Sequence, residues 1–146
     1  MSPEFALVDA NILVYSCYHD SEHHAASHAL LERAQDENAG LCVAAQWLTE
    51  FYCVVTNPRR VSPPREPNEV LDTIETLLKL PGLTLVPTPA DLPARWIRLT
   101  RRIAVRGADI FDVQLVATML ANDVTRIYTY NRPAFERFGE VKVLTP

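Results

Sequence analysis

Short apolar runs alternate with longer amphipathic segments along most of the chain. Five of these runs have the length of buried strands, namely residues 5–8, 41–44, 83–86, 126–129 and 141–144. Short, continuous apolar runs are typical of strands that are covered on both faces. No two-residue hairpin turn separates any of the first four runs. The pattern predicts an α/β fold, a three-layer α/β/α sandwich around a mostly parallel sheet of about five strands.

Helical periodicity fills the intervals between these strands. A short helix is expected from Ile12, and further helices are expected over residues 21–38, 46–57, 67–80, 90–105 and 110–121. The segment 58–67 is rich in Pro and Arg and is typical of a loop. The four glycines are isolated between patterned segments, which suits turns and argues against a Gly-rich phosphate-binding loop.

Length and composition narrow the class of protein. The 146 residues, 48% of them hydrophobic, predict one domain spanning 1–146. The start of the chain has no basic segment followed by a long apolar one, and no later stretch is long enough to span a bilayer, so we expect a cytoplasmic protein that does not bind membranes. Cys17, Cys42 and Cys53 are odd in number and lie in apolar stretches, so reduced core residues are expected. The net charge of −4 argues against bulk attraction to nucleic acid, but it leaves room for a local basic surface.

The first strand ends abruptly in polar residues, Asp9 and Asn11. In open α/β sheets, ligands bind at the carboxyl ends of the strands, so these side chains are candidates for chemistry. The alternative is that Asp9 or Asn11 caps the helix that follows, because both residue types cap helices well.

Two further carboxylates occupy unexpected positions on predicted helices. Glu50 lies beside Trp47 and Val54 at helical spacing, and Asp112 is in line with Leu115. A charge on an apolar face is unfavourable unless it is paired or binds a cation. The alternative for Glu50 is a place at the rim of the helix, where it reaches solvent.

Asp109 and Asp112 are also compatible with an N-cap and a first-turn acid favoured by the helix dipole. That explanation suits Asp109 better than Asp112, since first-turn acids usually face water. If Asp9, Glu50 and Asp112 converge, their pocket needs a cation, and oxygen ligands alone favour Mg²⁺, with Mn²⁺ as a substitute. Such an ion can activate water and neutralise a phosphoryl oxygen, as in metal-dependent nucleases.

The order and spacing of these motifs resemble a PIN domain. The matching residues are Asp9-Ala10-Asn11, Glu50 after the second strand, the segment 107–117 with Asp112, and Thr129-Tyr130-Asn131 closing the fourth strand. The segment 107–117 and the ending Phe135-Glu136-Arg137-Phe138 with 143–146 look like the VapC toxins of type II toxin–antitoxin systems.

The resemblance implies a Mg²⁺-dependent endoribonuclease of the prokaryotic cytoplasm that acts on RNA, is inhibited by a VapB antitoxin and typically forms a homodimer. It also implies that Asp9, Glu50 and Asp112 are catalytic, metal-coordinating residues. Asn11 and Thr129 take supporting polar positions in the first and fourth motifs. The departure from the family lies after the fourth strand, where Asn131 supplies no charge; a second ion would need the RNA phosphate or Asp109.

Arginines form the expected RNA-binding surface. No acid occurs between Asp91 and Asp109, and Arg95, Arg98 and Arg102 fall on one helical face. A phosphate-binding stripe and an ordinary solvated face share this pattern. A second candidate surface is the loop that contains three further arginines, Arg59, Arg60 and Arg65. The four histidines, His19, His23, His24 and His28, cluster in one segment, where a solvated or packed helix face is expected rather than a metal site.

Two other classes of function remain open at this point. A phosphatase or phospho-receiver also places an Asp after the first strand, but the phosphatase needs a second acid where this chain has Asn11. A catalytically weakened PIN fold that only binds RNA or a protein is suggested by the uncharged Asn131.

Overall fold

The computed structural model describes residues 4–146, and its centre is a five-stranded parallel sheet. The strands are β1 (Ala6–Val8), β2 (Leu41–Ala44), β3 (Leu83–Val86), β4 (Arg126–Tyr128) and β5 (Lys142–Leu144), in the order β3-β2-β1-β4-β5. Every neighbouring pair is parallel. The predicted α/β fold is therefore confirmed, and the sheet of residues 4–146 is wholly rather than mostly parallel.

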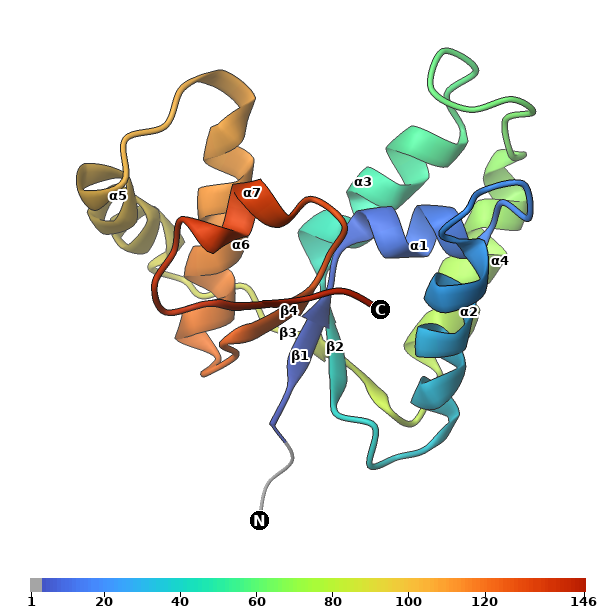
Figure 1. Cartoon of the computed structure of the whole chain (residues 1–146), viewed down its shortest axis with the longest axis horizontal. Coiled ribbons are helices and arrows are strands. Elements are labelled where there is room, and N and C mark those ends of the chain that lie inside the picture. Colours follow the sequence, from blue (N-terminus) through green and yellow to red (C-terminus); the bar gives the residue numbers. More distant parts are fainter. Residues whose placement is uncertain (1–3) are drawn as a thin grey trace.

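Helices cover the sheet on both sides. They are α1 (Ala10–Ser16), α2 (His24–Glu32), α3 (Ala45–Val55), α4 (Pro67–Leu78), α5 (Leu92–Arg102), α6 (Ile110–Ala121) and α7 (Arg132–Glu136), with 3₁₀ turns η1 (Arg33–Gln35) and η2 (Gly107–Asp109). Figure 1 shows α5 and α6 on one side of the strands and α1, α2 and α4 on the other. This arrangement is the predicted sandwich.

Several predicted boundaries were wrong. The helix expected over 21–38 is α2 and η1 alone, because side chains at both ends satisfy backbone N–H groups in turns instead. The hydroxyl of Ser21 accepts the N–H of His23, and the carboxylate of Asp36 accepts the N–H of Asn38. The helix expected over 90–105 is shorter, since Ile103 is already extended.

Helix α7 was not predicted at all. It has five residues, too few for a periodic pattern, and Pro133 lies in its first turn. Its position is set by packing instead, because Phe135 and Phe138 are 1% and 0% exposed. These two buried rings fix the chain on either side of Arg137.

The turn into β3 depends on a close approach of two backbone segments. Gly82 donates its N–H to the carbonyl of Ala34 at 2.7 Å, and its own carbonyl accepts the N–H of Leu41 at 3.1 Å. A Cβ on Gly82 would lie 2.1 Å from the Asp36 carbonyl oxygen. Only glycine fits there, and its contacts join the starts of β2 and β3.

The three cysteines are free, but they are not all core residues. Cys42 is buried and Cys17 half-buried, whereas Cys53 is exposed, contrary to the expectation from its apolar surroundings in sequence. Cys53 lies on the outward face of α3, since Phe51 and Val55 carry the buried face of that helix. No helix formed by residues 4–146 has the length and apolar character needed to cross a membrane.

Candidate active site at the carboxyl edge of the sheet

The connections of the sheet reverse direction beside β1. The chain leaves β1 for β2 and β3 on one side and then returns to β4 and β5 on the other. The carboxyl ends of β1 and β4 are neighbours, with Val8 paired to Tyr128. A reversal of this kind opens a crevice at the carboxyl ends of the strands, where α/β proteins bind ligands. Asp9 and Thr129 are the residues that follow these two strands.

Asp9 and Thr129 are buried and directly hydrogen-bonded. The hydroxyl of Thr129 donates to Asp9 Oδ2 at 2.5 Å, and Asp9 is 7% exposed. Thr129 Oγ1 in turn accepts the backbone N–H of Asn131 at 3.0 Å and the amide of Asn11 at 3.3 Å. Asp9 makes no side-chain capping bond to α1, so the alternative role as a helix cap is wrong for this residue.

Burial leaves the Asp9 carboxylate electrostatically strained. Its pKa is raised to about 6, chiefly by desolvation and further by the negative charges of Glu50 and Asp112. The hydrogen bond from Thr129 opposes this rise in pKa, because it favours the ionised form. A buried carboxylate whose pKa two neighbouring carboxylates raise lies in a pocket that a cation would stabilise.

Glu50 and Asp112 approach Asp9 from two different helices. Glu50 lies on α3 and is exposed, so the rim alternative describes its position correctly. The pKa of Glu50 is nevertheless raised, by partial desolvation and then by the charge of Asp112. Asp112 lies in the first turn of α6 with 22% of its side chain exposed, and desolvation raises its pKa as well.

The supporting residues differ in how they take part. Asp109 precedes α6 but makes no capping hydrogen bond, and its side chain is 61% exposed. Asn131 is exposed and holds Thr129 through its backbone N–H rather than its side chain. The amide oxygen of Asn11 is buried and has no hydrogen-bond partner among residues 4–146.

Arg137 also lies at this edge, although no pattern in the sequence assigned it a role there. Its Nη2 lies 3.7 Å from Asp112 Oδ2, and its Nη1 lies 3.9 Å from Asp109 Oδ2. The positive charge of Arg137 lowers the pKa of Asp112 and so offsets part of the effect of burial. No sequence signal pointed to this contact, because it depends on how α7 packs on α6.

The donor set at this edge fits a hard divalent cation. It offers only oxygen atoms, including the unpartnered amide oxygen of Asn11, and such ligands suit Mg²⁺ or Mn²⁺. As the side chains stand, however, no three acidic, His or Cys groups of residues 4–146 are close enough together to hold a metal ion.

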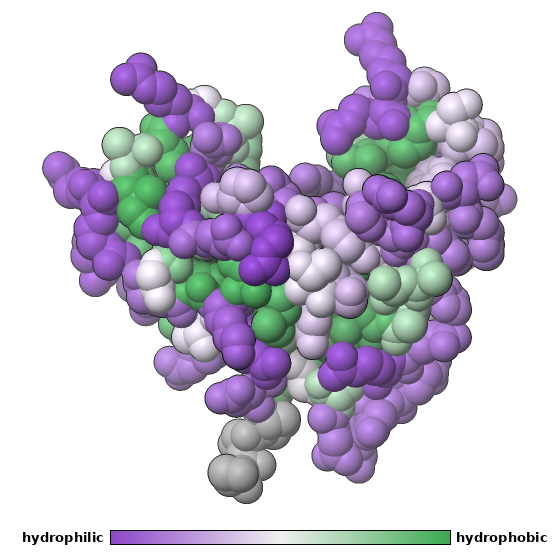
Figure 2. Space-filling model, in the orientation of Figure 1, coloured by the Kyte–Doolittle hydropathy of each residue, from purple (hydrophilic) through white to green (hydrophobic). Residues whose placement is uncertain are grey.

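A groove leads away from the acidic residues between α1 and α3. Its cavity of about 320 Å³ is lined by Asn11 and Glu50 at one end and by Tyr15, Tyr18 and Arg60 further along. Figure 2 shows a notch in the surface between the lobe of α3 with its following loop and the lobe of α5 and α6. The acidic residues are thus reached from a hollow of the surface.

The arginines of α5 form a second, separate cavity. Arg95, Arg98, Arg101 and Arg102 line about 480 Å³ together with Ala117 and Leu120, near the carboxyl end of α6. Arg95 is hydrogen-bonded to Asp91 at 2.8 Å and Arg102 to Glu140 at 2.7 Å. Arg98 and Arg101 have no such ion pair among residues 4–146. The predicted row of arginines on α5 is present, but it lies at the opposite end of α6 from Asp112.

The remaining candidates have structural contacts. Arg65 donates to the carbonyl of Cys17 and lies over the ring of Tyr18. His24 shares a hydrogen bond with the carbonyl of Tyr15 at 3.0 Å, and the ring of His23 stacks on that of Tyr130 at 4.0 Å. These contacts give His23 and His24 the packing role that was one of the expectations for this segment.

Comparison with known proteins agrees with this geometry. The family model described as PIN domain matches residues 6–141. Ribonuclease VapC43 of Mycobacterium tuberculosis is 33% identical over 121 residues, covering 81% of this chain and 80% of that protein. Ribonuclease VapC24 of the same organism is 30% identical over 141 residues, covering 95% and 94%.

Solved structures share the fold at low sequence identity. Mycobacterium tuberculosis VapC20, described as a sarcin-ricin loop cleaving toxin, superposes with a TM-score of 0.66 at 14% identity, covering 93% of this chain and 98% of that one. VapBC2 from Rickettsia felis, bound to a DNA fragment from its promoter, gives 0.66 at 16%, covering 97% and 98%. The match of the domain model over most of the chain, together with relatives at 30% identity or more, shows that this chain belongs to the PIN-domain family.

Proposed function

We propose that this protein is a Mg²⁺-dependent endoribonuclease toxin of a type II toxin–antitoxin system, with Mn²⁺ as a possible substitute. The observation that carries the proposal is the buried Asp9 carboxylate, whose pKa two other carboxylates raise at the point where the sheet reverses. The names of the relatives support the same reading, since VapC43 and VapC24 are both ribonucleases. A domain that served only as a scaffold would gain nothing from three acidic side chains that repel one another at one edge of the sheet.

In this proposal Asp9 and Asp112 hold the ion, and Glu50 binds it directly or through water. Bound Mg²⁺ would supply acidification of a water and charge neutralisation at the scissile phosphate. Thr129 holds the Asp9 carboxylate in place through its hydroxyl, and the amide nitrogen of Asn11 donates to Thr129 Oγ1. Attack in line with the leaving oxygen would leave 5′-phosphate and 3′-hydroxyl ends.

Asp109 and Asn131 take lesser parts. Asp109 adds negative charge beside Asp112 and raises its pKa, and Asn131 fixes Thr129. Neither replaces a fourth buried carboxylate, so one firmly held ion is proposed.

RNA is proposed to reach the acids through the notch and to contact the arginines of α5. Among Arg95, Arg98 and Arg102, the free guanidinium of Arg98 is the strongest candidate for a phosphate, because the other two already bind carboxylates. Arginine pairs with phosphate oxygens through two parallel N–H groups.

The proposed partner is a VapB-type antitoxin, in a homodimeric cytoplasmic toxin. Structures of the same fold include VapBC2 from Rickettsia felis and a toxin–antitoxin complex from Klebsiella pneumoniae. An acidic pocket is a natural acceptor for an arginine of an inhibitor. Antitoxin that fills the pocket should then exclude Mg²⁺; independent binding of both would contradict this mode of inhibition.

The second candidate function is a PIN fold that binds RNA or a protein without cutting. It is favoured by one observation, the absence from residues 4–146 of three ligands already close enough to hold a metal. Measured metal affinity separates the two functions. The phosphatase alternative is weaker, because position 11 is an amide whose nitrogen is bound to Thr129.

The test is cleavage of total RNA by the purified protein, freed of any bound partner. Reactions contain Mg²⁺, Mn²⁺ or EDTA, and they compare the wild type with Asp112→Asn and with Asp72→Asn, an exposed acid of α4. We expect metal-dependent cuts by the wild type and by Asp72→Asn and none by Asp112→Asn. Equal cleavage by Asp112→Asn would refute the assignment, and no cleavage by any protein would favour the binding function.

A further inference from the structure

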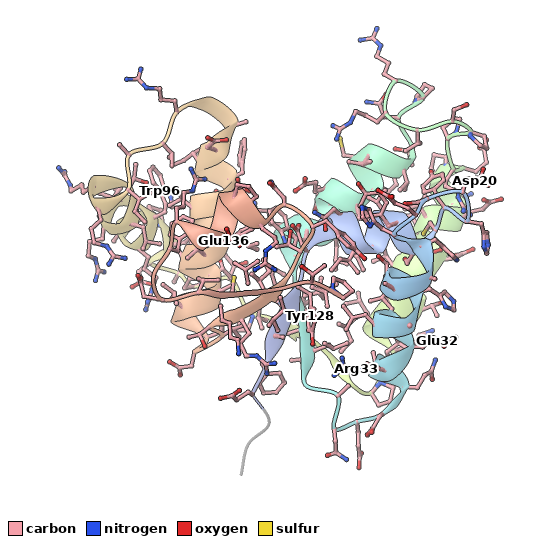
Figure 3. The ribbon with its side chains drawn as sticks, in the orientation of Figure 1. Asp20, Glu32, Arg33, Trp96, Tyr128 and Glu136 are labelled. Atoms are coloured by element: carbon pink, nitrogen blue, oxygen red, sulfur yellow. The ribbon has the colours of Figure 1, made fainter. Side chains whose placement is uncertain are left out.

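Arg137 is held rigidly beside the acidic residues by its place in the chain. Glu136, labelled in Figure 3, is the last residue of α7, and Arg137 follows it directly. The neighbouring Phe135 and Phe138 are buried in the core, and Arg137 Nε donates to the carbonyl of Ala134 at 2.9 Å. Its side chain is 28% exposed, so it is partly desolvated but open to a ligand.

The contacts of Arg137 differ from those of three other arginines that have acidic partners nearby. Arg95, Arg102 and Arg132 donate to their carboxylates at 2.7–2.8 Å, which is full hydrogen-bond distance. The two Nη atoms of Arg137 lie 3.7 and 3.9 Å from Asp112 and Asp109, too far for such bonds. Within the described part of the chain, its one side-chain hydrogen bond uses Nε.

Arg137 therefore brings a positive charge to the pocket. Its two Nη atoms donate no hydrogen bond within the described part of the chain. A guanidinium with one fixed edge and one free edge matches the oxygens of a phosphate diester. The two carboxylates hold the group at the pocket by charge without occupying its donors. The segment after β4 brings a cation to this pocket, whereas its own acid, Glu136, is bound to Arg132.

We propose that Arg137 binds the non-bridging oxygens of the scissile phosphate and stabilises the negative charge that develops there. This inference rests on the proposed nuclease function and adds a phosphate-binding residue to it. The positive charge takes up part of the repulsion among the acids, so one metal ion suffices. Before RNA arrives, the same charge also opposes metal binding, because Arg137 sits beside Asp112, the proposed ligand.

The experiment compares Arg137→Gln and Arg137→Lys with Arg132→Gln, which removes a charge from the same helix away from the acids. Mn²⁺ affinity is measured by calorimetry without RNA, and single-turnover cleavage of total RNA is measured alongside thermal unfolding. For Arg137→Gln we expect Mn²⁺ to bind about fivefold more tightly, as the loss of a cation near 4 Å predicts. Cleavage should fall about 100-fold or more.

Arg137→Lys keeps the charge but loses the planar pair of donors. It should bind Mn²⁺ as the wild type does and cleave about tenfold more slowly. Arg132→Gln should match the wild type in both assays. Tighter metal binding combined with slower cleavage is a signature that a merely structural role would not produce.

Three outcomes overturn the inference. Cleavage by Arg137→Gln at or above the wild-type rate would show that Arg137 only fills the pocket and contributes nothing to cleavage. Joint loss of Mn²⁺ binding, cleavage and thermal stability in both Arg137 variants would make it a structural residue. A wild type that cuts no RNA with Mn²⁺ overturns the nuclease function itself and the role of Arg137 with it, a result that is distinct from the other two.

Discussion

The hydroxyl of Thr129 donates a hydrogen bond to the Asp9 carboxylate, although 120 positions separate the two residues in sequence. The bond ties the end of β1 to the end of β4 at the reversal of the sheet. It also holds a carboxylate whose ionised form burial disfavours. This one hydrogen bond therefore contributes to the stability of the fold and also positions a candidate metal-binding carboxylate.

Replacement of Thr129 by Val should lower both the stability of the fold and the affinity of the site for metal. The buried carboxylate loses its hydrogen-bond donor, so the free energy of unfolding should fall by about 1–3 kcal/mol and Mn²⁺ affinity should drop. Urea unfolding and calorimetry measure the two effects. Thr129→Ser keeps the hydroxyl and should retain wild-type metal affinity. Wild-type stability and metal affinity in Thr129→Val, which keeps a methyl group and loses only the hydroxyl, would show that the hydrogen bond is dispensable.

The stability of the metal-free protein should depend on the ionisation of Asp9. Its pKa is raised from 3.8 to about 6 in the folded state, so the folded protein binds this proton more tightly than the unfolded chain. The stabilisation is complete below about pH 3.8 and is lost as pH rises through about 6. Between about pH 5 and 7.5 the free energy of unfolding should fall by about 1.4 kcal/mol from this group.

Urea unfolding in EDTA across that range tests the slope. Asp9→Asn should remove this contribution and be more stable than the wild type near pH 7.5, while losing cleavage. A slope unchanged in Asp9→Asn would assign the pH dependence to another group.

Added metal should stabilise the protein more at higher pH. Mn²⁺ competes with the proton on Asp9, so the rise in melting temperature should be larger near pH 7.5 than near pH 5.5. At about 100 times the dissociation constant, the gain in unfolding free energy is about 2.7 kcal/mol. Thermal unfolding with and without Mn²⁺ measures it, and Asp9→Asn should show little gain at either pH.

Glu50→Gln should separate activity from stability. Glu50 is exposed on α3, so its replacement should change the free energy of unfolding by less than about 0.5 kcal/mol. Cleavage should nonetheless fall, because the charge of Glu50 contributes to the acidic pocket. Cleavage assays beside urea unfolding, with the exposed Glu75→Gln of α4 as the matched control, test this; unchanged cleavage would place Glu50 outside the site.

Arg98→Gln should reduce RNA affinity without changing the chemical step. Loss of one phosphate contact should raise KM, leave kcat unchanged and lower the steepness of the salt dependence by about one contact. Arg95→Gln should have less effect, since Arg95 is already bound to Asp91. Equal effects of the two substitutions would contradict the role assigned to the unpaired guanidinium.

The fold could be predicted from the sequence because its central strands, β1 and β2, are buried along their whole length. Each of the five runs stands out as apolar, and β1 is fully buried along its length. Helix ends were less predictable, because local bonds such as that from His23 to Ser21 compete with helix formation and leave no hydrophobic pattern. Helix α7 was not predicted for a related reason, since two buried rings rather than a periodic apolar pattern hold it in place.

Some residues of the candidate site could likewise be predicted from the sequence, and others could not. Asp9, Glu50 and Asp112 could be proposed because each is a charge out of place in an apolar pattern or at a strand end. Arg137 could not, because a charged residue at the end of a short helix looks like any surface arginine until α7 is packed on α6. The exposure of Cys53 was equally hard to predict, since the rotation of α3 on the sheet sets it, whereas the exposure of Glu50 was one of the alternatives left open.

The strand order of the sheet has a consequence for synthesis of the protein on the ribosome. β1 is made early, but its neighbour β4 and the arginine after α7 are made only after residue 125. At about 5–20 residues per second, roughly 6–24 s pass between synthesis of Asp9 and of Thr129. A growing chain thus has Asp9 and Glu50 before it has the strand and the arginine that complete this edge of the sheet.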